Sequence, residues 1–330
     1  MTDLYDVAAI GNAIVDVIAP SSDDFIADQD LPKGGMTLID DLRAEALYEA
    51  MAPGQEASGG SAANSVAGIA SFGGRAAFIG KTADDQLGKV FAHDIRAIGA
   101  HFDTSPLDAA TAGTGRCLIN VTPDGQRTMA TFLGAANLLG PDDVDPKVIE
   151  QAKITFLEGY LFTPDAARKA FAKAAGLARA NDRLIALTLS AGFVVDMFRE
   201  TLIEFIETQV DILFANEEEI TLLFQTKSFE EAVELARPHV MIAALTCGAE
   251  GSVVIGGAES HKVRAEPIDR LVDTTGAGDA YAAGFLHGLA RGRPLGVCGR
   301  LGSIAAAEVI SHYGARPETS LRDLAIKAGL

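Results

Sequence analysis

Four mainly apolar runs decide the fold: LIALTLS (184–190), VDILFAN (210–216), VMIAALT (240–246) and SVVIGG (252–257). Several of them are apolar throughout instead of alternating with polar residues, which is typical of strands covered on both faces. A helical pattern over Phe229–Ala236 separates the second run from the third. Strands that alternate with helices imply right-handed crossovers and a mainly parallel sheet.

The same alternation extends towards the N-terminus. Further strand-like runs begin at Tyr5 (YDVAAIG), Ala76 (AAFIG) and Lys153 (KITFLEG), and residues 164–180 have a helical pattern. No internal repeat and no Pro/Ser-rich linker interrupts the 330 residues. We therefore expect an α/β fold with one domain over residues 1–330.

Two segments, residues 12–45 and 112–137, depart from this rhythm because they contain strand-like alternation without the accompanying helices. The second includes RCLINVTPDGQRTMATF (116–132), in which Pro123-Asp124-Gly125 marks a hairpin turn. Strands outside the βαβ series can form a sheet of their own. The two segments therefore predict a small β-sheet that acts as a lid over a cleft.

Composition limits the partners and the compartment. The formal net charge is −18, with 27 basic and 45 acidic residues, which argues against nucleic acid but not against a small anionic substrate. Cys117, Cys247 and Cys298 lie too far apart for a zinc cage or a disulfide framework. Asp3 and Asp6 stand where a signal peptide would be basic, and no apolar run approaches the roughly 20 residues that cross a bilayer. We expect a cytoplasmic protein that binds neither membrane nor nucleic acid.

The stretch with the clearest chemistry is DTTGAGDA (273–280), which runs into the helical pattern YAAGFLHGLARG (281–292). The small residues Gly276, Ala277 and Gly278 can direct backbone N–H groups into a concavity at the helix N-terminus, and this end of a helix attracts anions. Asp279 in the first turn could accept a proton from a hydroxyl while the amides hold a transferring phosphoryl group. The helix N-terminus is expected to keep Asp279 ionised and weakly basic. A purely structural alternative is an acidic residue that stabilises the first turn.

Two other glycine patterns are excluded. GGRAAFIGKT (73–82) has five residues instead of four between Gly74 and Gly80, and its apolar centre is strand-like, so it is not a phosphate-binding loop. The glycines at 276 and 278 lack the third glycine of a dinucleotide fingerprint, because Tyr281 occupies its place. Hydride transfer is therefore a distant alternative.

Two long motifs resemble one enzyme family. DTTGAGDAYAAGF (273–285) resembles the C-terminal signature of the ribokinase-like (PfkB) carbohydrate and nucleoside kinases, and GGSAANSVAGIASFGGRAAFIGKTADDQLG (59–88) resembles their N-terminal signature. The similarity extends from about Gly11 to about Gly314. Within the family, the chain is most similar to adenosine kinases, on the shorter matches GNAIVDVIA (11–19), KGGMTLIDDLRAEALYEAM (33–51), TFLGAANLL (131–139), EGYLFTP (158–164), LTLSAGF (187–193) and DILFANEEE (211–219).

The resemblance implies a mainly parallel sheet flanked by helices, a small β-sheet lid, and transfer of a phosphoryl group from ATP with Mg²⁺. The acceptor would be the 5′-hydroxyl of a nucleoside, with adenosine giving AMP, and the protein would be a monomer. The implied acceptor-binding residues are Asn12, Asp16, Gly59, Gly60, Asn64 and Phe193. Weaker candidates for the base-binding wall are Ile14, Thr37, Ile39, Cys117 and Leu161.

Structural alternatives remain for several acceptor residues. Asp16 would accept hydrogen bonds from vicinal ribose hydroxyls, but it could be a solvated residue at a strand end. The segment around Gly60 could be a helix N-terminus capped at Ser61, which is compatible with acceptor binding. Phe193 could be a core residue.

On the nucleotide side, the resemblance implies roles for Asn216, Glu219, Thr246, Gly248, Gly251 and Arg127. Glu219 would act on Mg²⁺ through ordered water, or else it belongs to the acidic first turn of a helix. Arg127 would clamp the transferring phosphate from the lid, or else it is a solvated hairpin residue. Asp273 and Thr275 would supply oxygens to a monovalent cation such as K⁺.

Three other functions stay open at this point. A sugar kinase for ribose or fructose would need a polar pocket wall, whereas Ile14, Ile39 and Phe193 favour a nucleoside base. A kinase of inosine or guanosine would share that apolar wall. A catalytically silent nucleoside or nucleotide sensor would not need the intact Asp279 or its glycine loop.

Overall fold

The computed structural model describes residues 4–330, so Asp3 and the first residues of the expected 1–330 domain lie outside the described part. The larger of its two sheets has eight strands, which are β1 (Tyr5–Ile10), β5 (Ala76–Ile79), β8 (Ala152–Glu158), β9 (Leu184–Thr188), β10 (Ile212–Asn216), β11 (Ile242–Thr246), β12 (Ser252–Gly256) and β13 (Glu259–Val263).

The strand order in this sheet is β13-β12-β11-β10-β9-β8-β1-β5. The neighbours from β11 to β5 pair in parallel, while β12 pairs antiparallel with both β11 and β13. The predicted mainly parallel sheet is confirmed, and all seven predicted strands belong to it. The edge strand β13 was not predicted because its sequence, ESHKV, is mostly polar and its side chains are not buried.

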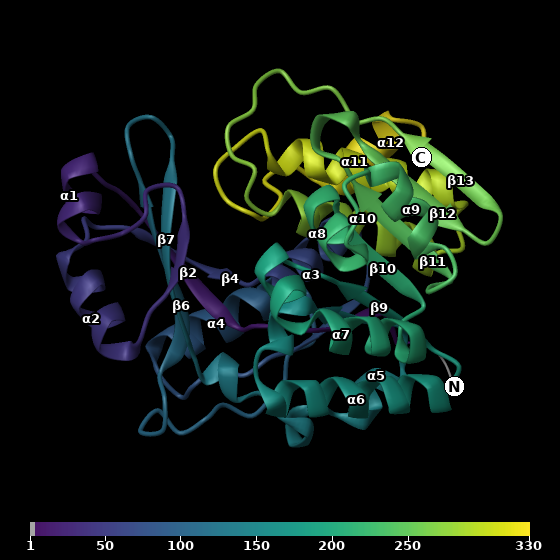
Figure 1. Cartoon of the computed structure of the whole chain (residues 1–330). Coiled ribbons are helices and arrows are strands. Elements are labelled where there is room, and N and C mark those ends of the chain that lie inside the picture. Colours follow the sequence, from purple (N-terminus) through teal and green to yellow (C-terminus); the bar gives the residue numbers. More distant parts are fainter. Residues whose placement is uncertain (1–3) are drawn as a thin grey trace.

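Helices cover both faces of the larger sheet (Figure 1). One face packs against α5 (Pro146–Glu150), α6 (Asp165–Ala180), α7 (Gly192–Gln209), α8 (Glu217–Phe224) and α9 (Phe229–Ala236). The other packs against α3 (Ser61–Ser71), α4 (Gln86–Ala97) and α10 (Ala277–Ala290), with α11 (Leu295–Val309) and α12 (Leu321–Lys327) beyond α10. Successive residues of β1 enter opposite cores, Ala8 one and Ala9 the other, which explains why the central strands are apolar throughout.

The predicted second sheet is present and has the order β3-β7-β6-β2-β4. Its strands are β2 (Ile14–Pro20), β3 (Met36–Leu38), β4 (Gln55–Gly59), β6 (Thr114–Val121) and β7 (Arg127–Gly134). Strands β6 and β7 form the expected hairpin, which is closed by the hydrogen bond from the Thr122 amide to the carbonyl oxygen of Gln126. β4 comes from outside the two predicted segments; its polar sequence, QEASG, gave no strand signal.

The second sheet, with α1 (Asp23–Asp28) and α2 (Asp41–Ala50), stands at one side of the molecule (purple to blue in Figure 1). Val17 and Leu118 pack with Ile26 of α1 and Leu47 of α2 in a small core of their own. Strand β2 alternates, so Asp16 lies on the opposite face from Val17 and lines a cavity. The sheet thus has one face with its own core and one face available to a ligand.

Short 3-10 helices complete the structure: η1 (Ala135–Leu138), η2 (Pro141–Asp143), η3 (Gly159–Phe162) and η4 (Gly248–Glu250). Among residues 4–330, no helix is both long and apolar enough to cross a membrane.

Candidate active site

The N-terminal ends of α3 and α10 meet at Asp279. Ser61 Oγ donates to Asp279 Oδ1 at 2.6 Å, and Asn64 Nδ2 donates to Oδ2 at 3.0 Å. The N-cap of α3 is Gly60, and no side chain caps this helix. The expected cap at Ser61 is therefore wrong: Ser61 is the first residue of the helix and its hydroxyl is used to hold the carboxylate of Asp279.

The environment of Asp279 makes it a better base than a solvated aspartate. Burial raises the pKa of Asp279, and the hydrogen bonds from Ser61 and Asn64 only partly oppose that rise. This differs from the expectation of a weak base kept ionised by the helix N-terminus. Loss of hydration outweighs the stabilisation of the charge at this position.

The loop before α10 forms a candidate anion site. Gly276 is the N-cap with φ of 77°, and an added Cβ would lie 2.5 Å from the Cβ of Ala315, so glycine is required twice over. The Ala277 amide donates to the carbonyl oxygen of Thr274 at 3.2 Å. The amides of Gly276, Gly278 and Asp279 have no hydrogen-bond partner among residues 4–330. Free amides at a helix N-terminus bind anions.

A cavity of about 400 Å³ lies between this loop and the second sheet. Its wall includes the predicted residues Ile14, Asp16, Gly60, Asn64, Cys117, Asn216, Glu219, Thr246, Thr275, Gly276, Ala277, Gly278 and Asp279. Ile119, Met129 and Tyr160 also line it and were not predicted. The cavity is thus bounded by apolar side chains of the second sheet on one side and by Asp279 with the free amides on the other.

Several predicted acceptor residues lie behind this wall instead of in it. Asn12 is buried, and Phe193 is 39% exposed. The ring centroid of Phe193 lies 6.0 Å from that of Tyr160, one of the aromatic residues that line the cavity. Gly59 has a supporting role, because a Cβ there would lie 2.4 Å from the Asp16 carboxyl group. Thr37, Ile39 and Leu161 do not line the cavity; Ile39 packs against the small core of the second sheet and Leu161 in the core of the main sheet.

Asp16 is not a solvated strand-end residue. Burial raises its pKa to about 7, and the charges of Arg316 and Arg127 oppose the rise. Arg316, in the loop after α11, was missed by sequence reasoning because no motif contains it. Its Nε and Nη2 atoms are buried and have no hydrogen-bond partner among the described residues.

Glu158, at the end of β8, is the second functional residue that was missed. Its Oε1 accepts from Asn12 Nδ2 at 2.6 Å, and its Oε2 accepts from the Ala62 amide at 2.9 Å and the Asn12 amide at 3.3 Å. Burial raises the pKa of Glu158 to about 7 against these hydrogen bonds. The residue lies in the EGYLFTP stretch but its partners are 96 and 146 positions away, so only the tertiary structure identifies it.

A second cavity, of about 520 Å³, shares Thr246, Thr274, Ala277, Gly278 and Tyr281 with the first. The predicted Gly248 and Gly251 line it, together with an unpredicted apolar wall of Ile268, Leu271, Ala306 and Ile310. Two ligands can therefore approach the same loop from opposite sides.

Glu219 belongs to the acidic first turn of a helix, which confirms the structural alternative for this residue and leaves a functional role open. Asn216 and Glu219 form a reciprocal capping box at the start of α8, with the Asn216 amide donating to Glu219 Oε2 at 3.0 Å. Glu219 also lines the first cavity, and burial raises its pKa to about 7. Residues 4–330 contain no cluster of three His, Cys, Asp or Glu side chains that could hold a metal ion.

Arg127 is not the solvated hairpin residue of the structural alternative. It is buried, its Nη2 lies 2.7 Å from Asp273 Oδ2, and its guanidinium lies 5.5 Å from the centre of the Tyr313 ring. Asp273 also accepts hydrogen bonds from the amides of Thr275 and Gly314. The Arg127–Asp273 ion pair therefore connects β7 of the second sheet to the loop that precedes α10.

The fold, the family match and the relatives below together identify the chain as a phosphotransferase with an alcohol acceptor. Residues 6–321 match the profile described as pfkB family carbohydrate kinase, and the chain belongs to this family. It is 50% identical to adenosine kinase from Sinorhizobium meliloti, whose crystal structure superposes with a TM-score of 0.92 over 98% of this chain and 99% of that one. A probable sugar kinase from Rhizobium etli is 47% identical, with a TM-score of 0.93 over 100% and 99%. Adenosine kinase 2 from Arabidopsis thaliana is 26% identical over 94% of this chain and 95% of its own length.

Proposed function

We propose that this kinase transfers the γ-phosphoryl group of ATP to the 5′-hydroxyl of adenosine. The observation that carries the proposal is the first cavity, where the apolar lid wall of Ile14, Ile119 and Met129 faces a site that ends at Asp279. A nucleoside fits such a cavity with its base against the wall and its 5′-carbon near the carboxylate. The adenosine kinases among the relatives support this acceptor.

Asp16 would accept hydrogen bonds from the ribose hydroxyls. Its carboxylate lines the cavity on the lid side, and Gly59 leaves room for it. A carboxylate offers several acceptor sites and therefore suits two vicinal O–H donors. This contact would turn the 5′-hydroxyl towards Asp279.

The ATP would lie in the second cavity, with its base against Ile268, Leu271 and Ile310 and its phosphates at the shared loop. The 5′-oxygen attacks the γ-phosphorus; the new O–P bond forms as the bond to the bridging oxygen of ADP breaks. Asp279 takes the hydroxyl proton. The free amides of Gly276 and Gly278 stabilise charge on the transferring oxygens.

Bound Mg²⁺ would neutralise charge on the phosphate oxygens of ATP. Glu219 would hold the water shell of the ion; its position in the cavity wall beside the loop supports this role. Arg127 would leave Asp273 for the transferring phosphate when the lid closes over the acceptor and excludes water.

The second candidate is a sugar kinase, for which the Rhizobium etli relative provides the specific observation. A free sugar would leave the apolar lid wall unfilled, and we therefore prefer the nucleoside. Inosine and guanosine differ from adenosine only in the base and would use the same wall.

The test is ADP release from Mg-ATP with adenosine, inosine, guanosine, ribose or fructose. We expect adenosine to give the highest kcat/KM. Preference for ribose or fructose would reject the nucleoside while keeping the kinase. Binding without turnover for every acceptor would instead favour a silent sensor.

Four properties remain predictions: a requirement for K⁺ near Asp273 and Thr275, a cytoplasmic location, a monomeric state, and a lid formed from residues 12–45 and 112–137. In this structure Asp273 is already paired with Arg127, so a cation would have to share that carboxylate. Activity in KCl compared with tetramethylammonium chloride tests the first of these.

A further inference from the structure

A third hollow, of about 400 Å³, lies at the opposite ends of the two helices that build the active site. Its wall includes Phe72 and Gly73 after α3, and His287 and Arg291 at the end of α10. Helix α10 has 14 residues, so this end lies about 20 Å from the catalytic end. The hollow is therefore separate from both cavities at the catalytic loop.

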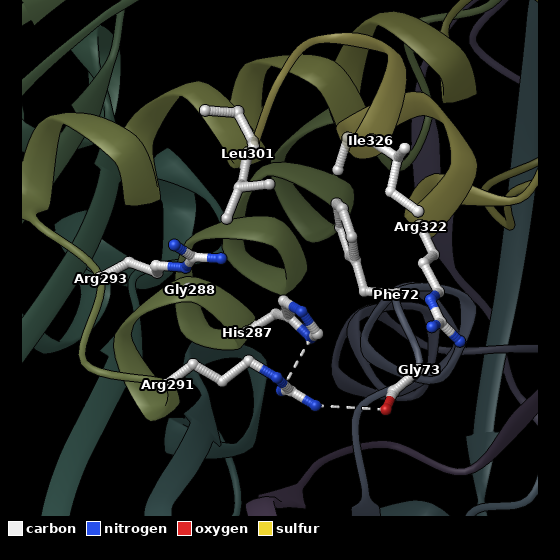
Figure 2. A pocket seen from close by; sticks show the side chains of 11 residues that line it. Phe72, Gly73, His287, Gly288, Arg291, Arg293, Leu301, Arg322 and Ile326 are labelled. Carbon is white, nitrogen blue, oxygen red and sulfur yellow. Dashed lines mark hydrogen bonds between the residues drawn. The ribbon is translucent and has the colours of Figure 1, made fainter.

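The hollow is cationic in a strongly acidic protein. Arg291, Arg293 and Arg322 line it, and none of the lining side chains is acidic. Figure 2 shows Arg291 and Arg293 on one side and Arg322 on the other, with His287 between them. The chain as a whole carries a net charge of −18. A cluster of three arginines without an acidic lining residue is thus a local reversal of the overall charge.

Arg291 already has a structural role. Its Nη1 donates to Asp6 Oδ2 at 3.2 Å, and its Nη2 donates to the carbonyl oxygen of Gly73 at 3.3 Å, beyond the end of α3. A cation is favourable at a helix C-terminus, so Arg291 needs no ligand. Arg291 also forms an ion pair with the buried carboxylate of Asp6, and Lys153 forms a second one.

Arg293 and Arg322 have no comparable contacts. Both are exposed to solvent, and neither guanidinium group makes a hydrogen bond or an ion pair with any residue in 4–330. The acidic residues nearest to Arg322 in the sequence, Asp323 and Glu318, do not line the hollow. The guanidinium groups of Arg293 and Arg322 therefore offer N–H donors at the hollow that are not used by other residues.

His287 adds a neutral donor. Burial, followed by the charge of Arg291, lowers the pKa of His287 to about 4, so the ring is neutral near pH 7. Arg291 Nη1 lies 3.2 Å from His287 Nδ1, and because an arginine can only donate, Nδ1 must be the acceptor. The proton is then on Nε2, which has no partner among the described residues.

We propose that this hollow is a non-catalytic site for a phosphate monoester. The forks of Arg293 and Arg322 would bind the phosphoryl oxygens, since arginine matches phosphate in geometry and charge. The apolar residues Leu301 and Ile326 would contact the organic part of the ligand. Free inorganic phosphate shares the first contact but not the second, so an ester with an apolar group binds more tightly.

The test is calorimetric titration of the protein with phenyl phosphate in saturating Mg-ADP, which fills the nucleotide side of the catalytic site. We expect saturable one-to-one binding with Kd below about 1 mM and weaker binding of inorganic phosphate. The double variant Arg293→Gln/Arg322→Gln should bind at least about tenfold more weakly. The control Arg179→Gln removes an exposed arginine on α6 and should leave Kd unchanged.

Thermal unfolding and basal ADP release check that the double variant is folded, because neither arginine belongs to the catalytic site. Equal affinity in the wild type and the double variant would overturn the proposal. So would the absence of saturable binding to the wild type at about 10 mM phenyl phosphate.

Discussion

Replacing Glu158 by glutamine changes one atom in the network behind the acceptor cavity. The amide oxygen of the glutamine can still accept the hydrogen bonds that the backbone amides of Asn12 and Ala62 now donate to Oε2. The new NH₂ group takes the place of Oε1 and faces Asn12 Nδ2, which was 2.6 Å from it. Two donors cannot pair, so we expect the Asn12 amide to rotate and offer Oδ1, which is buried and has no partner at present.

The size of the expected change in the free energy of unfolding follows from the raised pKa of the Glu158 carboxyl group. Burial raises the pKa of Glu158 from 4.5 to about 7, and such a change corresponds to about 3 kcal/mol. The folded state holds this proton more tightly than the unfolded state, so the free energy of unfolding falls as pH rises from about 4.5 to about 7. Glutamine has no such proton. Glu158→Gln should therefore be close to the wild type at pH 5 and more stable by about 2–3 kcal/mol at pH 8.

The assay is urea unfolding at several pH values between 5 and 8, together with kcat and KM for adenosine. The variant should have a higher KM because the Asn12 amide is reversed, while its stability rises. Glu45→Gln, at an exposed position on α2, is the control and should change neither quantity. Parallel stability curves for Glu158→Gln and the wild type would refute the reasoning.

Four further predictions concern the catalytic loop and the lid. Asp279→Asn should lower kcat about 10²–10⁴-fold in ADP release, and retention of a tenth of the activity would exclude it as the base. Because burial raises the pKa of Asp279, kcat/KM should fall on the acid side at a pH above about 4, and a flat pH–rate profile down to that value contradicts this. Gly276→Ala should lower both Tm and kcat, because Gly276 has a φ of 77° and an added Cβ would clash with Ala315. Gly278→Ala has open space at its Cβ and should keep the Tm of the wild type. Similar losses of Tm in the two variants would contradict the expected backbone strain at Gly276. Arg127→Met should destabilise the fold by about 3–5 kcal/mol in urea unfolding, because Asp273 would be left buried without its ion-pair partner. Adding Asp273→Asn in the same chain should recover part of this loss. If the effects of the two single substitutions on the free energy of unfolding simply add in the double variant, the two residues do not interact.

Two strands were not predicted, β4 in the second sheet and β13 in the main sheet, and the physical reason is the same for both. The central strands of the main sheet are buried on both faces, and their apolar runs are visible in isolation. Strands β4 and β13 are held mainly by backbone pairing, and their polar side chains carry no such signal. The hairpin at Pro123 was predictable because turn chemistry is local.

In the candidate site, too, features with a local sequence signal were predicted and features that depend on distant residues were not. Gly276 and Asp279 lie within one motif, and the requirement for a left-handed residue before a helix is a local property of the chain. Sequence alone therefore determined the α/β class and the family resemblance, and it predicted the loop before α10 as a candidate anion site. The pairing of Asp279 with Ser61, the role of Glu158, the position of Arg316 and the cationic hollow each join residues more than 60 positions apart or depend on burial. Only the tertiary structure decided these, because proximity and desolvation arise when distant segments pack together.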